Sequence, residues 1–164
     1  MNWLAFVRVI SIVCTGLAAG VFLGHGMGVA FAGPQLSASS FVQLQQIIHT
    51  QFVPMMPILL AGAAGTSILW AYLIRASRGF DLWFVLFAAT AMVATFVLTR
   101  VVNVPINEQL MTWSVQAPPV NLTELWQPWQ RAHSIRTVLA LLAFVLLASA
   151  ASTFVPDRRQ PIYP

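Results

Sequence analysis

The chain has 164 residues, of which 59% are hydrophobic and only 7% are charged. Soluble domains carry roughly 25% charged residues, so this composition excludes an ordinary soluble globular protein and a disordered chain. The single cysteine excludes a disulfide-stapled scaffold. An integral membrane protein remains, and its length suits one domain over residues 1–164.

Three long segments contain no Asp, Glu, Lys or Arg: residues 9–74, 82–99 and 137–156. A helix needs roughly 20 apolar residues to cross the hydrocarbon core, so the first segment is long enough for two crossings. The continuous apolar runs argue against a membrane β-barrel, whose strands alternate. The sequence therefore predicts an all-α, four-helix membrane bundle. The predicted spans lie near Val9–Ala32, Phe52–Ile74, Leu82–Val102 and Arg131–Phe154.

The net charge of +4 comes from eight arginines and four acidic residues. Most of these cations lie at the ends of predicted spans, so we interpret them as topology signals and not as a nucleic-acid site. The cations assigned to one side are Arg8, Arg75, Arg78, Arg158 and Arg159. The two links on the other side are Gly33–Gln51 and Asn103–Gln130. They contain no arginine or lysine, and their only charged residues are Glu108 and Glu124. The positive-inside rule then predicts cytoplasmic termini, and we expect a bacterial inner (plasma) membrane.

The first outer link is predicted to contain a further helix. Ser39 or Ser40 suits its N-cap, and the apolar and amide residues that follow continue to His49. Pro54 and Pro57 then kink the entry to the second span, because each removes a backbone donor.

The first span contains glycines at four-residue spacing, which let helix backbones approach closely in lipid. They are Gly16, Gly20, Gly24 and Gly28. We interpret this face mainly as helix packing. It is also where a second copy or a partner from a membrane complex would dock.

Ionisable residues inside membrane spans are energetically costly and usually face the bundle interior. In this chain they gather at the outer end of the predicted spans. On the third span, Arg100, Asn103 and Asn107 follow i, i+3, i+7 spacing and are predicted to share one face. Pro105 removes one backbone hydrogen bond in this stretch. Glu108 points away from Arg100 and is expected to meet a cation on a neighbouring helix.

The fourth span carries a second polar stripe at the same depth. Trp129, His133 and Arg136 follow i, i+4, i+7 spacing. His25 in the first span and His49 before the second can reach this depth as well. We therefore expect one pocket at the outer end, whose imidazoles, guanidinium groups and amides suit an anionic or enolisable hydrophobic small molecule.

Two alternatives to this pocket stay open. In the first, the residues are purely structural: Arg100 and Arg131 reach the headgroups, and Arg136 pairs with Glu108. In the second, the pocket holds zinc, copper or haem. The metal set would be His25, His49, His133 and Glu108. No HxH, HxxxH or HExxH spacing supports it, so we predict neither metal nor cofactor.

The run Val104-Pro105-Ile106-Asn107-Glu108, followed by Trp129-x-x-x-His133-x-x-Arg136-Thr137, resembles the anthrone-oxygenase-like membrane protein family. The resemblance implies a four-helix membrane bundle and oxidation of an anthrone to a quinone by dioxygen, without a recognised cofactor. It carries over Asn107, His133 and Arg136 as catalytic residues. Most members of that family have no assigned activity.

The predicted function is oxidation, by dioxygen, of an enolisable or phenolic aromatic resembling an anthrone or hydroquinone. His133 is predicted to act as the base, and Arg136, Arg100 and Asn107 to stabilise the enolate or phenolate. The residues predicted to bind substrate are Arg100, Asn103, His49, His25, Trp129 and Glu108. The alternative is a non-enzymatic protein, either an accessory subunit of a membrane complex or a lipid- or quinone-binding protein.

Overall fold

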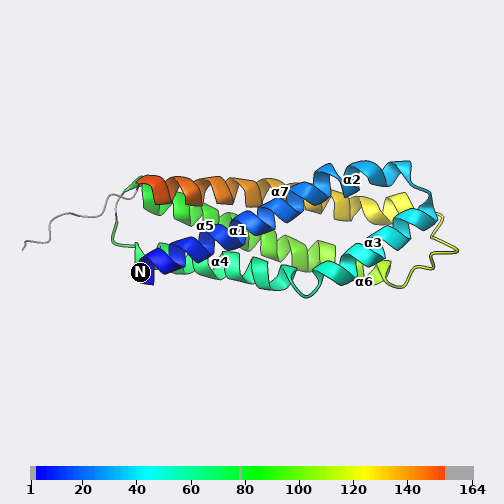
Figure 1. Cartoon of the computed structure of the whole chain (residues 1–164), viewed down its shortest axis with the longest axis horizontal. Coiled ribbons are helices and arrows are strands. Elements are labelled where there is room, and N and C mark those ends of the chain that lie inside the picture. The colour runs from blue at the N-terminus through cyan, green and yellow to red at the C-terminus, as the bar shows by residue number, and fades with distance from the viewer. Residues whose placement is uncertain (1–2, 78, 154–164) are drawn as a thin grey trace, which may run out of the picture.

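The computed structural model describes residues 3–77 and 79–153, and within these ranges it contains helices and no strand (Figure 1). Four long helices run up and down along one axis: α1 (Trp3–Met27), α4 (Met56–Leu73), α5 (Phe80–Leu98) and α7 (Leu122–Thr153). Helices α1 and α5 each pack against both α4 and α7, so the four form a closed ring. The predicted all-α four-helix bundle is confirmed.

Four stretches are long and apolar enough to cross a membrane, namely Trp3–Gln35, Met56–Leu73, Phe80–Leu110 and Leu122–Ser152. Three of them extend beyond the predicted spans. The predicted first span began after Arg8, the third ended at Val102 and the fourth began at Arg131, but the helices continue past all three positions. Helical structure therefore continues past the apolar segments at both ends of the bundle. The predicted end at Phe154, Arg78 and the arginines of the C-terminal tail lie outside the described residues.

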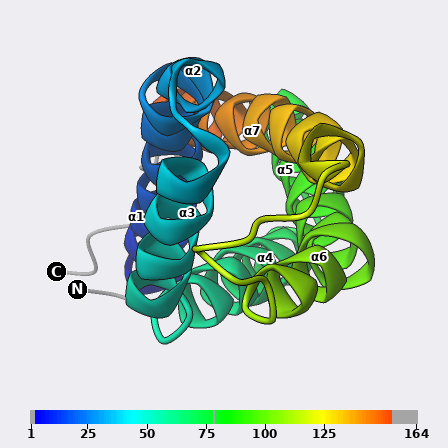
Figure 2. The ribbon, with the colours of Figure 1, turned by 90° about the vertical axis from the view of Figure 1, so that its right-hand side faces the viewer.

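One end of the bundle, which we call the outer end, carries the short elements of the fold (Figure 1). These are α2 (Val29–Ala32), the 3-10 turn η1 (Gly33–Gln35), α3 (Ala38–Phe52), η2 (Thr99–Asn103) and α6 (Val104–Leu110). Figure 2 looks onto this end and shows residues 111–121 crossing from α6 to α7. The first and last described residues lie at the opposite end (Figure 1).

The predicted extra helix of the first outer link is α3. Its cap is Ser37, not Ser39 or Ser40: the Ser37 hydroxyl accepts a hydrogen bond from the backbone N–H of Ser40 at 3.2 Å. Ser37 is the residue with extended backbone angles directly before the helix, which is the conformation an N-cap requires. The side chain of Gln46 ties α3 to α6 by donating to the carbonyls of Leu110 and Trp113 at 3.0 and 2.9 Å.

The third span contains one π-helical turn, η2, between α5 and α6. Its cause lies in Pro105, which has no N–H to donate to the carbonyl of Val101. A wider turn ahead of the proline accommodates the missing bond, and such turns often occur at functional sites. A π-turn contains one more residue than an α-helical turn. This extra residue changes the direction in which Asn107 points relative to Arg100.

The bundle interior is built largely from small side chains that allow close helix packing. Fully buried alanines occur on all four long helices, at Ala18, Ala63, Ala88 and Ala143. The hydroxyls of Ser11 on α1 and Ser67 on α4 form a buried hydrogen bond of 2.9 Å. These contacts hold the half of the bundle away from the outer end together.

The glycine face of α1 divides into two parts. A Cβ atom added at Gly16 would lie 2.8 Å from the ring of Phe144, so this glycine permits the close approach of α7. An added Cβ at Gly20 or Gly24 would meet no atom within 4 Å. Gly20, Gly24 and Gly28 are exposed in the described structure, and docking of a partner there stays a prediction.

Candidate active site

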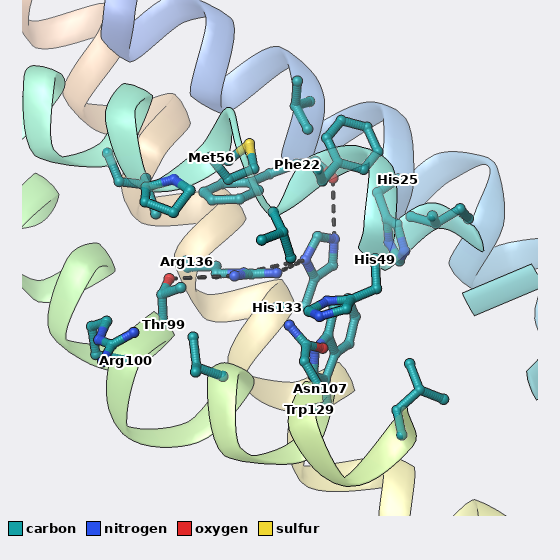
Figure 3. A pocket seen from close by; sticks show the side chains of 18 of the residues that line it. Phe22, His25, His49, Met56, Thr99, Arg100, Asn107, Trp129, His133 and Arg136 are labelled. Carbon is teal, nitrogen blue, oxygen red and sulfur yellow. Dashed lines mark hydrogen bonds between the residues drawn. The ribbon is translucent and has the colours of Figure 1, made fainter. Parts of the chain in front are cut away.

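A cavity of about 510 Å³ lies inside the outer half of the bundle (Figure 3). All four spans and α3 contribute to its wall, and its volume falls within the roughly 300–1,000 Å³ of small-molecule sites. Most of the wall is apolar, being formed by Val21, Phe22, Ile48, Phe52, Val53, Met56, Pro57, Leu60, Phe96, Val104, Leu110 and Trp129. The polar wall residues are His25, Gln45, His49, Thr99, Arg100, Asn107, Glu108, His133 and Arg136.

A chain of hydrogen bonds runs along the cavity wall, and Figure 3 shows it from the carbonyl of Phe22 through His133 and Arg136 to Thr99. His133 Nε2 lies 3.1 Å from the carbonyl of Phe22, so this nitrogen carries the proton and donates it. The other ring nitrogen, Nδ1, accepts from Nε and NH2 of Arg136 at 3.3 and 3.0 Å. NH1 of Arg136 donates to the hydroxyl of Thr99 at 3.3 Å, and that hydroxyl donates to the carbonyl of Thr95 at 2.8 Å.

Arg136 is a buried cation, with 7% of its surface exposed. Its guanidinium carbon lies 4.5 Å from the ring centre of Phe22 and 5.2 Å from that of Trp129. No carboxylate in the described part of the chain lies within ion-pair distance, so the alternative pair of Arg136 with Glu108 is not formed. The guanidinium has five N–H groups, and its three bonds to protein atoms leave two N–H groups for a ligand.

His25 and Gln45 are polar wall residues whose buried nitrogens are not all satisfied within the protein. The two ring nitrogens of His25 and Nε2 of Gln45 have no partner in full hydrogen-bond geometry among the described residues, although the Gln45 side chain lies close enough to the ring to engage one of its nitrogens. Gln45 is only 3% exposed, and it lies beside His25. Buried polar groups are nearly always hydrogen bonded, so these atoms are positioned for a ligand or for water.

An aromatic stack follows one face of α7. The rings of Trp126 and Trp129 stack at 4.4 Å, and Trp129 stacks on His133 at 4.9 Å. The indole N–H of Trp129 donates to Oδ1 of Asn107 at 2.7 Å, and Nδ2 of Asn103 donates to the carbonyl of Trp129 at 3.2 Å. The two asparagines therefore fix Trp129. Asn107 also lines the cavity, whereas Asn103 is fully buried and is absent from the cavity wall.

The predicted residues Arg100, Glu108 and His49 lie at the rim of the cavity. Arg100 and Glu108 are exposed, and His49 is partly buried at the end of α3. Burial lowers the pKa of His49 below its ordinary value, and the nearby carboxylate of Glu108 opposes this shift. The exposed apolar side chain of Val53 completes this side, so the mouth combines apolar and charged surface.

The alternative metal set of His25, His49, His133 and Glu108 is not assembled. Among the described residues, no three His, Cys, Asp or Glu side chains are placed to hold one metal ion. The physical reason lies in His133, because both of its ring nitrogens are engaged in hydrogen bonds. It therefore has no lone pair to offer zinc, copper or a haem iron in this arrangement. His25 and His133 do meet, with ring centres 4.7 Å apart.

Three contributors to the site were not predicted from the sequence: Gln45, Thr99 and the carbonyl of Phe22. Gln45 precedes His49 by one helical turn and so shares its face, a spacing that would have identified it. Thr99 is the first residue of the π-turn, and its hydroxyl accepts from NH1 of Arg136 across the interface with α7. No sequence pattern identifies a particular backbone carbonyl as a partner.

Comparison with known families gives one match. The family model described as anthrone oxygenase matches residues 44–146, which is more than half of the chain. The chain therefore belongs to the anthrone oxygenase family. The matched segment contains Asn107, His133 and Arg136 and does not include α1, which carries His25. Neither the curated proteins nor the solved structures contain a match.

Proposed function

We propose that this protein oxidises an enolisable or phenolic aromatic compound with dioxygen in the cavity at the outer end. The observation that carries the proposal is the state of Arg136, a buried cation with no carboxylate partner among the described residues. A buried charge is costly unless it is compensated, so the cavity favours an anionic ligand. The mostly apolar wall favours an anion that is delocalised over a hydrophobic ring system.

The chemistry needs only the substrate, a base and dioxygen. Loss of a proton from an acidic C–H group gives an enolate, which passes one electron to dioxygen. The two resulting radicals combine into a C–O bond, and protonation gives a hydroperoxide. Loss of water from the hydroperoxide leaves a ketone, so that one CH₂ group and one O₂ yield one C=O group and one H₂O. A hydroquinone would instead give a quinone and hydrogen peroxide.

The protein contributes electrostatic stabilisation and positioning in this scheme. The two unengaged N–H groups of Arg136 and the Nδ2 amide of Asn107 are donors for the oxygen that gains charge. A donor fixed in a dry site stabilises such charge more than one in water does, because it needs no reorganisation. Trp129 supplies an aromatic wall, and Arg100, Glu108 and His49 form the mouth.

The test is oxygen uptake and quinone formation by purified protein in mild detergent, with an anthrone as substrate and a protein-free control for spontaneous oxidation. We expect catalysed oxidation by the natural chain and a loss of at least about 100-fold in Arg136→Gln, a typical cost of removing one donor from an oxyanion site. Arg131→Gln is the matched control, since Arg131 is exposed on the same helix. Uptake no faster than the protein-free rate, or a fully active Arg136→Gln, would refute the function.

A second candidate function is binding of a quinone or lipid without turnover. It is supported by the apolar wall and by the exposed apolar side chain of Val53 at the mouth. The same purified protein separates the two functions. Saturable quenching of tryptophan fluorescence by a quinone, reduced in Trp129→Phe and accompanied by no oxygen uptake on any reduced substrate, would identify a binding protein.

We further propose that residues 1–164 form one domain in a bacterial inner membrane, with both termini cytoplasmic. Arg8 and Arg75 lie at the end of the bundle opposite α3 and α6, as the positive-inside rule requires. A reporter that is active only in the cytoplasm, fused to the C-terminus, should be active. A reporter inserted at Gln116, in the segment that crosses the outer end, should be inactive.

A further inference from the structure

We propose that the proton acceptor of the site is His25, and that His133 positions Arg136 instead of acting as the base. This inference rests on the proposed function, because it assigns a role in the same reaction. It departs from the simplest assignment, which places the base on the motif that contains His133 and Arg136.

The first argument is that His133 has no lone pair facing the cavity. Its protonated nitrogen donates to the carbonyl of Phe22 at 3.1 Å. Its other nitrogen accepts from two nitrogens of Arg136. To take a proton from a substrate, His133 would have to release Arg136 and place a second positive charge beside it. Both changes oppose proton transfer.

The second argument is that His25 has what His133 lacks. A neutral imidazole carries one N–H donor and one lone pair. In His25 both nitrogens are buried and the residue lines the cavity wall; the side chain of Gln45 lies close enough to engage one ring nitrogen, so at least one buried nitrogen has no protein partner among the described residues. The ring is held in place by aromatic contacts, with ring centres 4.7 Å from His133 and 5.2 Å from Trp129. Leaving such nitrogens unpaired is costly unless a ligand or water engages them.

The third argument concerns the placement of base and cation. His133 contacts both groups, since its ring centre lies 4.7 Å from that of His25 and its Nδ1 accepts a hydrogen bond from Arg136 (Figure 3). In an anthrone, the acidic CH₂ and the carbonyl oxygen lie on opposite edges of the central ring. Deprotonation at one edge places negative charge on the oxygen at the other. Such a substrate needs a base and a cation at two different positions, and the cavity wall contains both.

The proton balance is complete with this assignment. His25 takes one proton as the enolate forms. The protonated imidazole returns that proton to the peroxide oxygen after the C–O bond has formed. The hydroperoxide then loses water, so His25 is neutral again at the end of the cycle.

A binding experiment tests the assignment without turnover. The probe is a nitrophenol, because its neutral and ionised forms absorb at different wavelengths. We expect the natural protein to bind it as the phenolate, with its proton on His25. In His25→Phe, which keeps an aromatic ring against His133 and Trp129, the ionised fraction of bound probe should fall at least tenfold. His25→Gln should behave in the same way and guards against misfolding of the first variant.

His133→Asn is the discriminating variant. We expect it to bind the probe more weakly, because Arg136 loses its partner, but still as the phenolate. Equal ionisation in His25→Phe and natural protein, loss of ionisation only in His133→Asn, or binding of neutral phenol by the natural protein would each overturn the assignment. These outcomes are independent of anthrone oxidation, so a protein that ionises the probe but oxidises no anthrone would refute the proposed function alone.

Turnover gives a second readout if oxidation is observed. His25→Phe should lower kcat by about 100-fold or more, the usual contribution of general base catalysis, with little change in KM. Added imidazole should restore part of the kcat lost in His25→Ala, which leaves space for it, and none of that lost in Arg136→Gln. A His25→Phe variant with unchanged kcat would contradict the assignment.

Discussion

Arg136 directs two of its nitrogens, Nε and NH2, to the same acceptor, Nδ1 of His133, at 3.3 and 3.0 Å. A single acceptor contacted twice fixes the plane of the guanidinium as well as its position. The remaining contact, from NH1 to Thr99, fixes the opposite edge. The guanidinium is therefore preorganised before any ligand binds, which is the condition under which electrostatic stabilisation is most effective.

Thr99→Val should weaken catalysis with little effect on folding. The change keeps the shape of the side chain but removes the hydroxyl that accepts from Arg136. A hydrogen bond to a charged group contributes about 1.5 kcal/mol, which corresponds to about tenfold in kcat/KM. Thr90→Val is the matched control, because Thr90 makes the same hydroxyl-to-carbonyl bond on the same span but is exposed. Equal effects of the two changes would show that the contact with Arg136 is unimportant.

Substitutions of the neighbouring glutamines Gln45 and Gln46 in α3 should affect different properties, the first substrate binding and the second stability. Gln46→Leu breaks two hydrogen bonds to carbonyls of the outer end, so we expect a loss of about 1–3 kcal/mol in the free energy of unfolding. Gln45→Leu removes a buried amide nitrogen with no partner, so stability should be kept or raised. Its KM should rise about tenfold if the amide binds an oxygen of the substrate.

Thermal unfolding in detergent and steady-state kinetics on both variants check this pair. The reverse pattern, with Gln45→Leu unstable and Gln46→Leu altered in KM, would contradict the assigned roles.

Alanine at Gly16 and at Gly20 should have opposite effects on stability. At Gly16 the new Cβ atom would lie 2.8 Å from the ring of Phe144, so that ring must shift in the contact between α1 and α7. Overpacking of this kind costs about 1–3 kcal/mol. At Gly20 the new Cβ would meet nothing, and the higher helix propensity of alanine contributes about 1 kcal/mol. Melting temperatures of the two variants provide the measurement.

His49 should contribute a pH dependence of stability. Burial lowers its pKa below the ordinary value of about 6.5, so the folded chain binds a proton there less readily than the unfolded chain. Stability is therefore lost as pH falls from about 6.5 through the lowered folded-state pKa, and it is unaffected by His49 at higher pH.

Melting temperatures between pH 5 and 8 should fall less steeply at the acid end in His49→Gln than in the natural chain. Glu108→Gln should steepen the fall, since the carboxylate partly offsets the effect of burial. Identical pH profiles of the natural chain and His49→Gln would disprove this contribution.

The helical architecture was predictable from the sequence because charged residues are scarce. The hydrogen-bond arrangement of the candidate site was not predictable in this way. Charge-free segments predict spans directly, and the spacing of Trp129, His133 and Arg136 correctly predicted a shared face, since their side chains are in mutual contact. The third span is harder to interpret from spacing, because the π-turn inserts one residue, and the buried Asn103 is not among the residues of the cavity wall. The roles of the histidines depend on which nitrogen meets which carbonyl, as with Phe22, and that information is three-dimensional.

The π-turn η2 makes the orientation of α6 depend on the exact number of residues in the third span. An α-helix turns by about 100° per residue, so removing one residue from 99–103 would restore the α-helical repeat and rotate α6 by about that angle. Asn107 would then leave the cavity wall while α5 kept its packing. The span thus consists of two halves with different helical phases, one packed in the bundle core and one facing the cavity.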